Sequence, residues 1–170
     1  EIDLLKEVQP YAIITTNYDP FLENIFEGYD VVIGQDLLRS NFTSVGEIFK
    51  IHGCTSEPES LVLTESDYSE FNNKKKYLSA KLLTYFAEHP LALIGYNPND
   101  PNIRNILSDI DEIISTNGGA IDNIYVLQWN TDISDDEYPK REEIIQVEGN
   151  RGVRVNNVEY EDLSWPLESL

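Results

Sequence analysis

Polar side chains that could take part in chemistry gather in three short turns, each directly after an apolar run. The three turns are Thr15–Asp19, His52-Gly53 and Gly95–Asp100, the last of which begins Gly95-Tyr96-Asn97. Imidazole transfers protons near neutral pH, and a carboxamide can hold a water molecule or a hydroxyl group by hydrogen bonding. In a parallel sheet, strand carboxyl ends and helix starts meet at one edge, where α/β proteins bind ligands. We therefore expect the three turns to form one ligand site.

Each of these residues also has an ordinary structural interpretation. Asp19 stands before Pro20, which is the position of a helix N-cap before a first-turn proline. Asn17 suits a tight turn, because asparagine tolerates left-handed backbone geometry. A histidine that follows a strand is often structural, and Gly53 and Gly95 are compatible with simple strand ends. A site is therefore indicated by the combination of turns and not by any one residue.

The elements that must position these turns follow from the apolar pattern. Short, β-branched runs predict strands over residues 11–14, 31–33, 48–51, 91–94, 124–129 and 153–155, the last as an edge strand. Helical spacing predicts helices over residues 1–8, 20–26, 68–88, 100–114 and 140–148. The second of these helices should bury Phe21, Leu22, Ile25 and Phe26. The tail, residues 162–170, offers an aromatic anchor in Trp165 but no clear element.

This alternation predicts the α/β class, as a three-layer Rossmann-like domain with a largely parallel sheet. We expect residues 1–170 to be a single domain. The chain has no methionine, so we also expect it to be a piece of a longer protein.

Charge and cysteine content exclude several classes of function. The formal net charge is −19, whereas nucleic acid binding needs a positively charged surface, so we exclude it. The same charge gives no general attraction for an anionic ligand, which must be held by local hydrogen-bond donors. We interpret the basic run Lys74-Lys75-Lys76 as a solvated helix face. No apolar run reaches the length of a membrane span. The single cysteine, Cys54, excludes a multi-cysteine zinc site, and we interpret it as a small buried residue in a cytoplasmic protein.

Taken in order, the three turns carry a family resemblance. The segments TTNYDP, KIHG and LALIGYNPNDPNI resemble the sirtuin-like (silent-information-regulator-like) domain. They are most similar to its bacterial branch, found in anti-phage defence proteins that cleave NAD. The resemblance runs from about residue 11 to residue 114, and it is the order and spacing of the motifs that make it specific.

The resemblance implies a role for each matching position. Asn17 would contact the nicotinamide ribose and position an attacking water, Asp19 would lie near the nicotinamide carboxamide, and His52 would be the catalytic histidine. Cleavage of the nicotinamide bond passes through an oxocarbenium-like ribose, and this chemistry suits a neutral imidazole and a water-holding amide. The remaining NAD-binding positions implied by the match are Thr15, Thr16, Gly53, Gly95, Tyr96 and Asn97, with Asn97 in place of the family's serine.

Two departures from the family pattern refine this expectation. Sirtuin deacylases carry a zinc ribbon of two Cys-x-x-Cys pairs, which a chain with Cys54 alone cannot form, so we expect NAD hydrolysis without zinc. The family's first strand and its Gly-Ala-Gly-x-Ser phosphate loop have no counterpart in these residues. Because pyrophosphate binding uses the close backbone approach of such a loop, we expect the chain to carry part of the site.

Three hypotheses remain open at this stage. The first is a defence NADase that hydrolyses NAD to nicotinamide and ADP-ribose. The second is a non-catalytic module that senses NAD or ADP-ribose or mediates assembly. The third is a zinc-free, NAD-dependent protein deacylase. As partners we expect NAD or ADP-ribose and either a homo-oligomer or further domains of the same protein, with no nucleic acid and no membrane.

Overall fold

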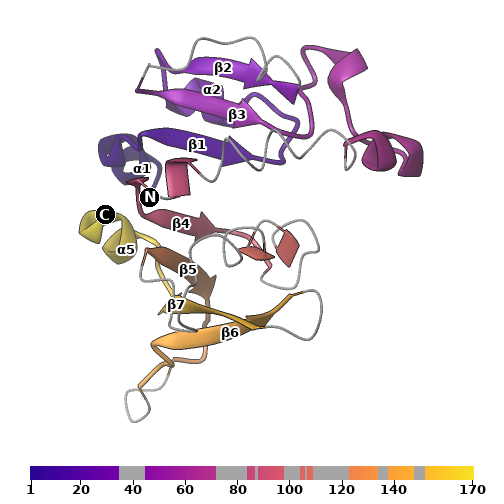
Figure 1. The fold of residues 1–170 in the computed structure, drawn as a ribbon. Coiled ribbons are helices and arrows are strands. Elements are labelled where there is room, and N and C mark those ends of the chain that lie inside the picture. The colour runs from indigo at the N-terminus through magenta and orange to yellow at the C-terminus, as the bar shows by residue number, and fades with distance from the viewer. Residues whose placement is uncertain are drawn as a thin grey trace. The chain divides into compact units, whose positions relative to one another are not determined.

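The computed structural model of the chain describes residues 1–34, 45–71, 84–86, 88–97, 104–105, 107–108, 123–133, 138–147 and 152–170. The chain forms two compact units, Glu1–Leu78 with Leu170, and Ser79–Ser169, and each is described by itself (Figure 1). Among the described strands, four pairings are parallel and one is antiparallel. The predicted α/β class with mainly parallel strands is therefore confirmed.

The first unit contains a three-stranded parallel sheet in the order β1-β3-β2. Its elements are α1 (Ile2–Val8), β1 (Ala12–Thr15), α2 (Phe21–Ile25), β2 (Asp30–Ile33), β3 (Glu47–Lys50) and the short 3-10 helix η2 (Pro58–Ser60). Each strand lies within one residue of its predicted position, because an apolar run in a parallel sheet marks the strand directly.

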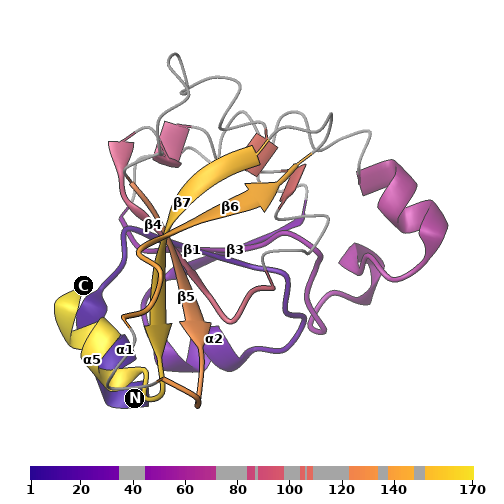
Figure 2. The ribbon, with the colours of Figure 1, turned by 90° about the horizontal axis from the view of Figure 1, so that it is seen from below.

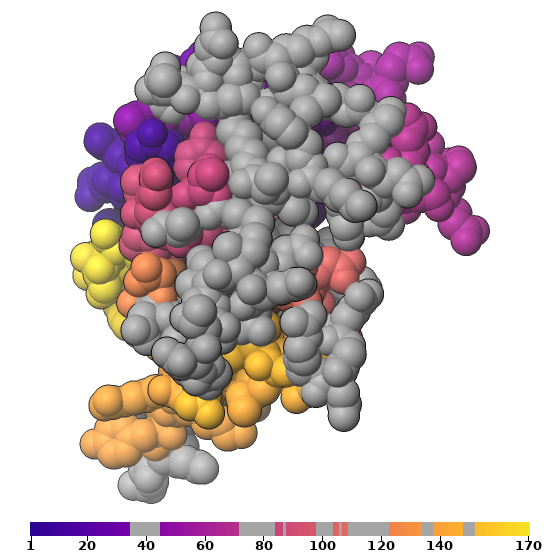
Figure 3. Space-filling view, viewed as in Figure 1, coloured from indigo at the N-terminus to yellow at the C-terminus, as the bar shows by residue number. Residues whose placement is uncertain are grey.

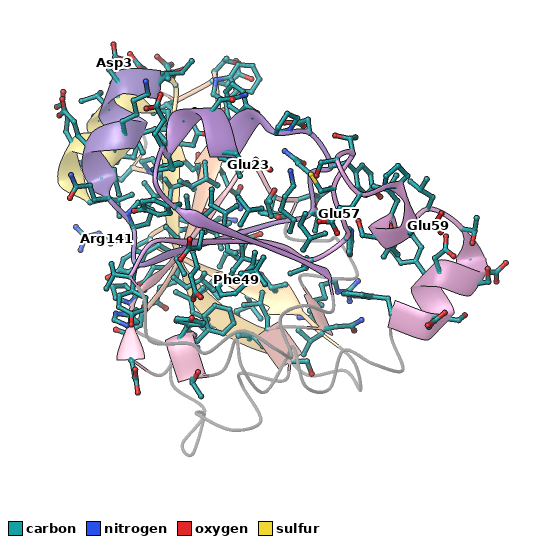
Figure 4. All side chains as sticks on the ribbon, turned by 90° about the horizontal axis from the view of Figure 1, so that it is seen from above. Asp3, Glu23, Phe49, Glu57, Glu59 and Arg141 are labelled. Carbon is teal, nitrogen blue, oxygen red and sulfur yellow. The ribbon has the colours of Figure 1, made fainter. Side chains whose placement is uncertain are left out.

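An apolar cluster on one face of this sheet attaches α2. Ile48 on the central strand β3 is fully buried and packs with Ile25 and Phe26. The next residue along β3, Phe49, points to the opposite face, as side chains on a strand alternate (Figure 4). The predicted buried face of the helix is thus confirmed for Ile25 and Phe26. It is wrong for Phe21, which is 52% exposed. Phe21 is the first residue of α2, and the apolar cluster includes Leu22 but not Phe21.

The second unit contains a four-stranded sheet in the order β4-β5-β7-β6. Its elements are β4 (Leu91–Ile94), β5 (Ile124–Trp129), β6 (Glu142–Gln146), β7 (Gly152–Tyr160) and the helix α5 (Ser164–Ser169). The bounds of β4 and β5 agree with the sequence prediction. Figure 2 shows β5 beside β7, with which it pairs in parallel, and β6 runs antiparallel to β7.

The predicted helix over residues 140–148 is wrong, because this segment forms the strand β6. Ile145 and Val147 are 3% and 4% exposed, whereas Ile144 before them is 54% exposed and Gln146 between them is also exposed. That alternation has the period of a strand, and β-branched residues favour extended backbone. The atoms of residues 138–147, which include this strand, are orange in Figure 3.

The strand predicted over residues 153–155 is longer than expected, and it is not an edge strand. β7 spans nine residues and pairs with β5 on one side and β6 on the other. Its second half contains several polar residues, so the apolar pattern predicts only residues 153–155 as a strand. Asn156 and Asn157 are accommodated because their side-chain amides donate to the carbonyls of Ile124 and Lys140, both at 3.2 Å.

The tail also differs from prediction, because it forms α5. The Asp162 carboxylate accepts the Ser164 backbone N–H at 2.8 Å and so caps the helix start. Trp165, the predicted anchor, is 50% exposed, and the buried residues are Pro166 and Leu167. A proline near a helix start is compatible with helical backbone, since the first N–H groups have no partner within the helix.

Two predicted helices, over residues 68–88 and 100–114, lie largely outside the described residues, as do Lys74–Lys76. Their described parts, at residues 65–71, 84–86, 88, 104–105 and 107–108, are helical. Within the described ranges, no helix has the length and apolar character needed to cross a bilayer.

The strand assignment of β6 predicts unequal costs for two adjacent isoleucines. Ile145→Ala should lower the free energy of unfolding by about 3 kcal/mol, because it leaves a cavity in the core. Ile144→Ala should cost less than about 1 kcal/mol, because that side chain is half exposed. Urea unfolding followed by circular dichroism measures both. Equal losses would contradict the strand.

Candidate functional site

The first two polar turns begin side by side at the carboxyl ends of β1 and β3. Thr15 pairs with Lys50 in the register of the two strands, and the Ile51 backbone N–H donates to the Thr15 carbonyl at 3.0 Å. The predicted convergence is therefore confirmed for the turns at residues 15–19 and 52–53. The third turn follows β4 in the other unit, and its place beside these two stays a prediction.

Asn17 presents an exposed side chain at this edge. Its backbone N–H donates to the Thr15 hydroxyl at 3.0 Å, and Thr15 itself is 5% exposed. The Thr15 hydroxyl thus stabilises the turn. Thr16, which lies between Thr15 and Asn17 in the chain, is half-buried. Of these predicted site residues, Asn17 is the one whose side chain is open to solvent.

The predicted N-cap role of Asp19 is wrong, because Pro20 occupies the N-cap position of α2, but the Asp19 carboxylate still bonds to the start of the helix. Its Oδ1 accepts the Phe21 backbone N–H at 2.9 Å, and α2 begins at Phe21. Pro20 stands before the helix and not in its first turn, one residue earlier than predicted. Asp19 is exposed, so its bond to the Phe21 N–H leaves part of the carboxylate accessible to solvent.

The His52 imidazole is buried, with 3% of the residue exposed. The rings of Tyr68 and Phe71 meet it edge-on, with centroid distances of 5.5 and 5.1 Å. Its backbone carbonyl accepts the Val62 N–H at 3.0 Å. In this conformation the imidazole is covered by aromatic side chains from the helical segment at residues 65–71.

Gly53 is required by a close backbone approach. Its φ is +95°, and a Cβ at this position would lie 2.3 Å from the Ser60 carbonyl oxygen. Only glycine fits such a contact without a shift of the neighbouring backbone. Gly53 therefore folds residues 54–60 back against the end of β3, which is a structural role beside its predicted one.

The third turn is solvent-accessible. Gly95 has φ of +71°, and a Cβ there would meet nothing within 4 Å. Gly95 and Asn97 are exposed and Tyr96 is half-buried. The backbone geometry alone explains the glycine, since left-handed φ is costly for other residues.

Sequence analysis missed Lys50, whose side chain is completely buried. Its Nζ donates to the carbonyls of Tyr18 (3.4 Å) and Asp19 (2.5 Å) and to Glu23 Oε1 (2.6 Å). Burial by itself lowers the pKa of Lys50, but hydrogen bonds and charge from Glu23 and Cys54 outweigh it, so the pKa is raised. A lysine inside the apolar run Ile48-Phe49-Lys50-Ile51 was the available signal, because a buried charge needs partners.

Cys54 is buried as predicted, at 2% exposure. Its sulfur accepts a hydrogen bond from the Ser56 hydroxyl at 3.2 Å and lies 3.9 Å from Glu23 Oε1. Burial raises the pKa of the thiol, but the bonds from Ser56 and the nearby Lys50 more than offset this, and the pKa is lowered.

Tyr18 links the loop after β1 to the loop after β3. Its hydroxyl donates to the Val62 carbonyl at 2.8 Å, and its own carbonyl accepts the Thr55 backbone N–H at 2.9 Å. Burial, together with Tyr68, raises the pKa of the phenol. Tyr18 therefore joins the two loops through its side-chain hydroxyl and through its backbone carbonyl.

A capping box starts the helical segment that covers His52. The Thr64 hydroxyl accepts the Asp67 N–H at 3.3 Å, and Asp67 Oδ2 accepts the Thr64 N–H at 2.8 Å. These bonds, with one from the Leu63 N–H, lower the pKa of Asp67. The motif Thr64-Glu65-Ser66-Asp67 was legible in the sequence and places the helix start earlier than predicted.

Within the part of the chain that the structure describes, no group of three or more His, Cys, Asp or Glu residues is arranged to hold a metal ion.

Comparison with known proteins identifies relatives of this chain. Residues 11–150 match the family model described as SIR2-like domain. Defense-associated sirtuin 2 of Bacillus subtilis is 30% identical over an alignment of 112 residues, and the match covers 62% of this chain and 11% of that protein. The NAD(+) hydrolase ThsA of Enterococcus faecium is 29% identical over 117 residues, 61% of this chain and 23% of that protein.

A second ThsA, from Cytobacillus dafuensis, is 28% identical over 111 residues. The matched segments are less than a quarter of the length of these relatives.

The close approach at Gly53 predicts a large effect for Gly53→Ala, with Gly28→Ala as a matched control. Gly28 has nearly the same φ, +91°, but a Cβ there would meet nothing within 4 Å. In both variants the left-handed backbone of an alanine costs about 1–2 kcal/mol. Steric overlap with Ser60 should lower the free energy of unfolding of Gly53→Ala by at least about 2 kcal/mol more than that of Gly28→Ala. Urea unfolding measures the difference. Equal losses would show that the Ser60 contact relaxes without cost.

The capping box predicts a pH-dependent contribution from Asp67. Because its folded pKa lies below the ordinary value of 3.8, its contribution is complete above that value and is lost as the pH falls through the folded pKa. The gap in unfolding free energy between the parent and Asp67→Ala should therefore shrink on acidification. Glu27→Ala, which removes an exposed carboxylate, serves as control. A gap that stays constant to the lowest pH would contradict the role of the Asp67 charge.

Proposed function

The chain belongs to the SIR2-like domain family, and we propose that its domain binds NAD and hydrolyses it to nicotinamide and ADP-ribose. The observation that carries the proposal is the adjacency of two loops at one sheet edge, one bearing Asn17 and the other His52. Relatives named NAD(+) hydrolase support the choice of substrate.

In the proposed reaction, the bond between nicotinamide and ribose breaks and water forms a new bond to the same ribose carbon. The ribose passes through an oxocarbenium-like state, and nicotinamide leaves without a strong general acid. The Asn17 amide holds the water or a ribose hydroxyl, and the His52 imidazole accepts the proton that the water releases. Both groups act through neutral side chains, which suits a cationic reaction centre.

The described residues fit this substrate in part. Asn17 and Asp19 are both exposed at the edge, which supports the proposed contacts of Asn17 with the ribose and of Asp19 with the nicotinamide carboxamide. His52 is covered by Tyr68 and Phe71, so NAD turnover requires these rings to move. Such a conformational step before chemistry is common in enzymes.

The remaining predicted NAD contacts belong to the same proposal. They are Thr15, Thr16 and Gly53 in the first unit and Gly95, Tyr96 and Asn97 in the second. We propose that residues 1–170 act as one NAD-binding domain within a longer cytoplasmic defence protein, with no zinc. The relative named defense-associated sirtuin supports the defence role, and Cys54 as the single cysteine supports a zinc-free site.

A second candidate function is a non-catalytic module that binds NAD or ADP-ribose as a sensor or mediates assembly. The covered imidazole of His52 favours it, because a buried histidine between aromatic rings is well suited to a structural role. A zinc-free deacylase is the weaker alternative, and its signature would be acyl transfer from a lysine peptide to ADP-ribose.

The experiment measures nicotinamide release from NAD by the full-length protein and its variants. Asn17→Ala and His52→Gln should each reduce the rate by at least about 100-fold, since each removes a group acting in the transition state. Asn24→Ala and His89→Gln are the matched controls, an exposed asparagine on α2 and the other histidine of the chain. Circular dichroism verifies that every variant is folded.

The outcomes separate the candidates. Loss of turnover in both site variants, with unchanged controls, supports the NADase. Binding of ADP-ribose without NAD consumption by the parent protein supports the sensor module. Unchanged turnover in either site variant removes that residue from the chemistry.

A further inference from the structure

We infer that the buried pair Lys50 and Glu23 is a positioning device, which holds the loop at residues 16–20 so that Asn17 faces the substrate. The inference rests on the proposed function, because it assigns these two residues a task in presenting Asn17. It concerns residues that lie next to the proposed catalytic pair but do not belong to it.

The first observation is the complete satisfaction of a buried ammonium group. Lys50 Nζ has three N–H donors and three acceptors: the carbonyls of Tyr18 and Asp19 and the carboxylate of Glu23. Figure 4 shows Glu23 on α2, above the strands of the first unit. One side chain on β3 therefore joins the loop after β1 to the helix that follows the loop.

The second observation is where these bonds fall relative to Asn17. Its backbone N–H donates to the Thr15 hydroxyl on one side, and on the other side the next carbonyl, that of Tyr18, accepts from Lys50. The same carbonyl also accepts the backbone N–H and the hydroxyl of Thr55. The peptide group before Asn17 and the one after Tyr18 are thus held while the Asn17 side chain is exposed, which is an arrangement that presents a side chain to a ligand.

The third observation is that the stability of the apolar core does not require a charged residue at position 50. Lys50 is the last residue of β3, and its neighbours in the chain, Phe49 and Ile51, are buried apolar residues. Replacing a buried ion pair by apolar residues of similar volume often leaves a protein equally stable. A lysine at this point is explained by its two bonds to loop carbonyls, which no apolar side chain can supply.

The experiment compares full-length variants by stability, kinetics and hydrogen exchange together. Lys50→Met alone leaves the Glu23 carboxylate without its partner and should lower the melting temperature. The double variant Lys50→Met/Glu23→Leu should recover most of that loss, because no uncompensated charge remains. Lys6→Met, an exposed lysine on α1, is the matched control.

The positioning role predicts that stability and turnover separate. In the double variant, kcat for nicotinamide release should remain roughly 10- to 100-fold below the parent value with a smaller change in KM, because Asn17 is misplaced. Amide exchange in residues 16–21 and at Thr55 should be faster than in the parent and in Lys6→Met. A purely structural role would return kcat and exchange to parental values together with stability.

Two negative results have different meanings. If the double variant matches the parent in kcat and in exchange over residues 16–21, the positioning inference is overturned while NAD hydrolysis stands. If the parent protein releases no nicotinamide, the proposed function fails, and the exchange rates alone decide whether Lys50 holds the loop.

Discussion

The burial of one ammonium group, that of Lys50, is the constraint on which the proposed site depends. A charge removed from water must keep its partners, and those partners come from the loop after β1 and from α2. The bonds therefore set the path of the loop that carries Asn17 and the angle at which the helix leaves it. The neighbouring thiol of Cys54 adds to the same cluster, since its sulfur lies beside Glu23 and accepts from Ser56.

Around this cluster, the two strand-end loops are fastened to each other by main-chain contacts. Gly53 lets the loop after β3 fold back against Ser60, and Tyr18 reaches across to Val62. The same architecture places a capped helical segment over His52, with Tyr68 and Phe71 against its ring. The loop bearing Asn17 is thus rigidly supported while the imidazole is enclosed. Of the two proposed catalytic residues, Asn17 is therefore exposed and His52 is buried.

The contrast between an exposed Asn17 and an enclosed His52 suggests how the proposed reaction is controlled. In the proposed reaction, the enclosed imidazole of His52 can accept a proton only after the covering segment moves. The relatives extend well beyond the region matched here, and further chain is a natural source of such control. The acidic composition of this chain, with a net charge of −19, leaves the attraction of an anionic ligand to local donors at the strand ends.

Sequence alone determined the parallel α/β class, the positions of β1, β3, β4 and β5 and the two adjacent polar turns, because each depends on a local apolar run and the turn that ends it. It misjudged β6, β7 and α5. Their burial alternation and satisfied polar groups, such as Asn156 bonded to Ile124, exist only once the strands are paired. The role of Lys50 belongs to the same class, since its acceptors stand 27 to 32 residues away along the chain. Whether a lysine is a solvated charge or a buried tether is decided by partners that tertiary packing brings to it, and no local pattern records them.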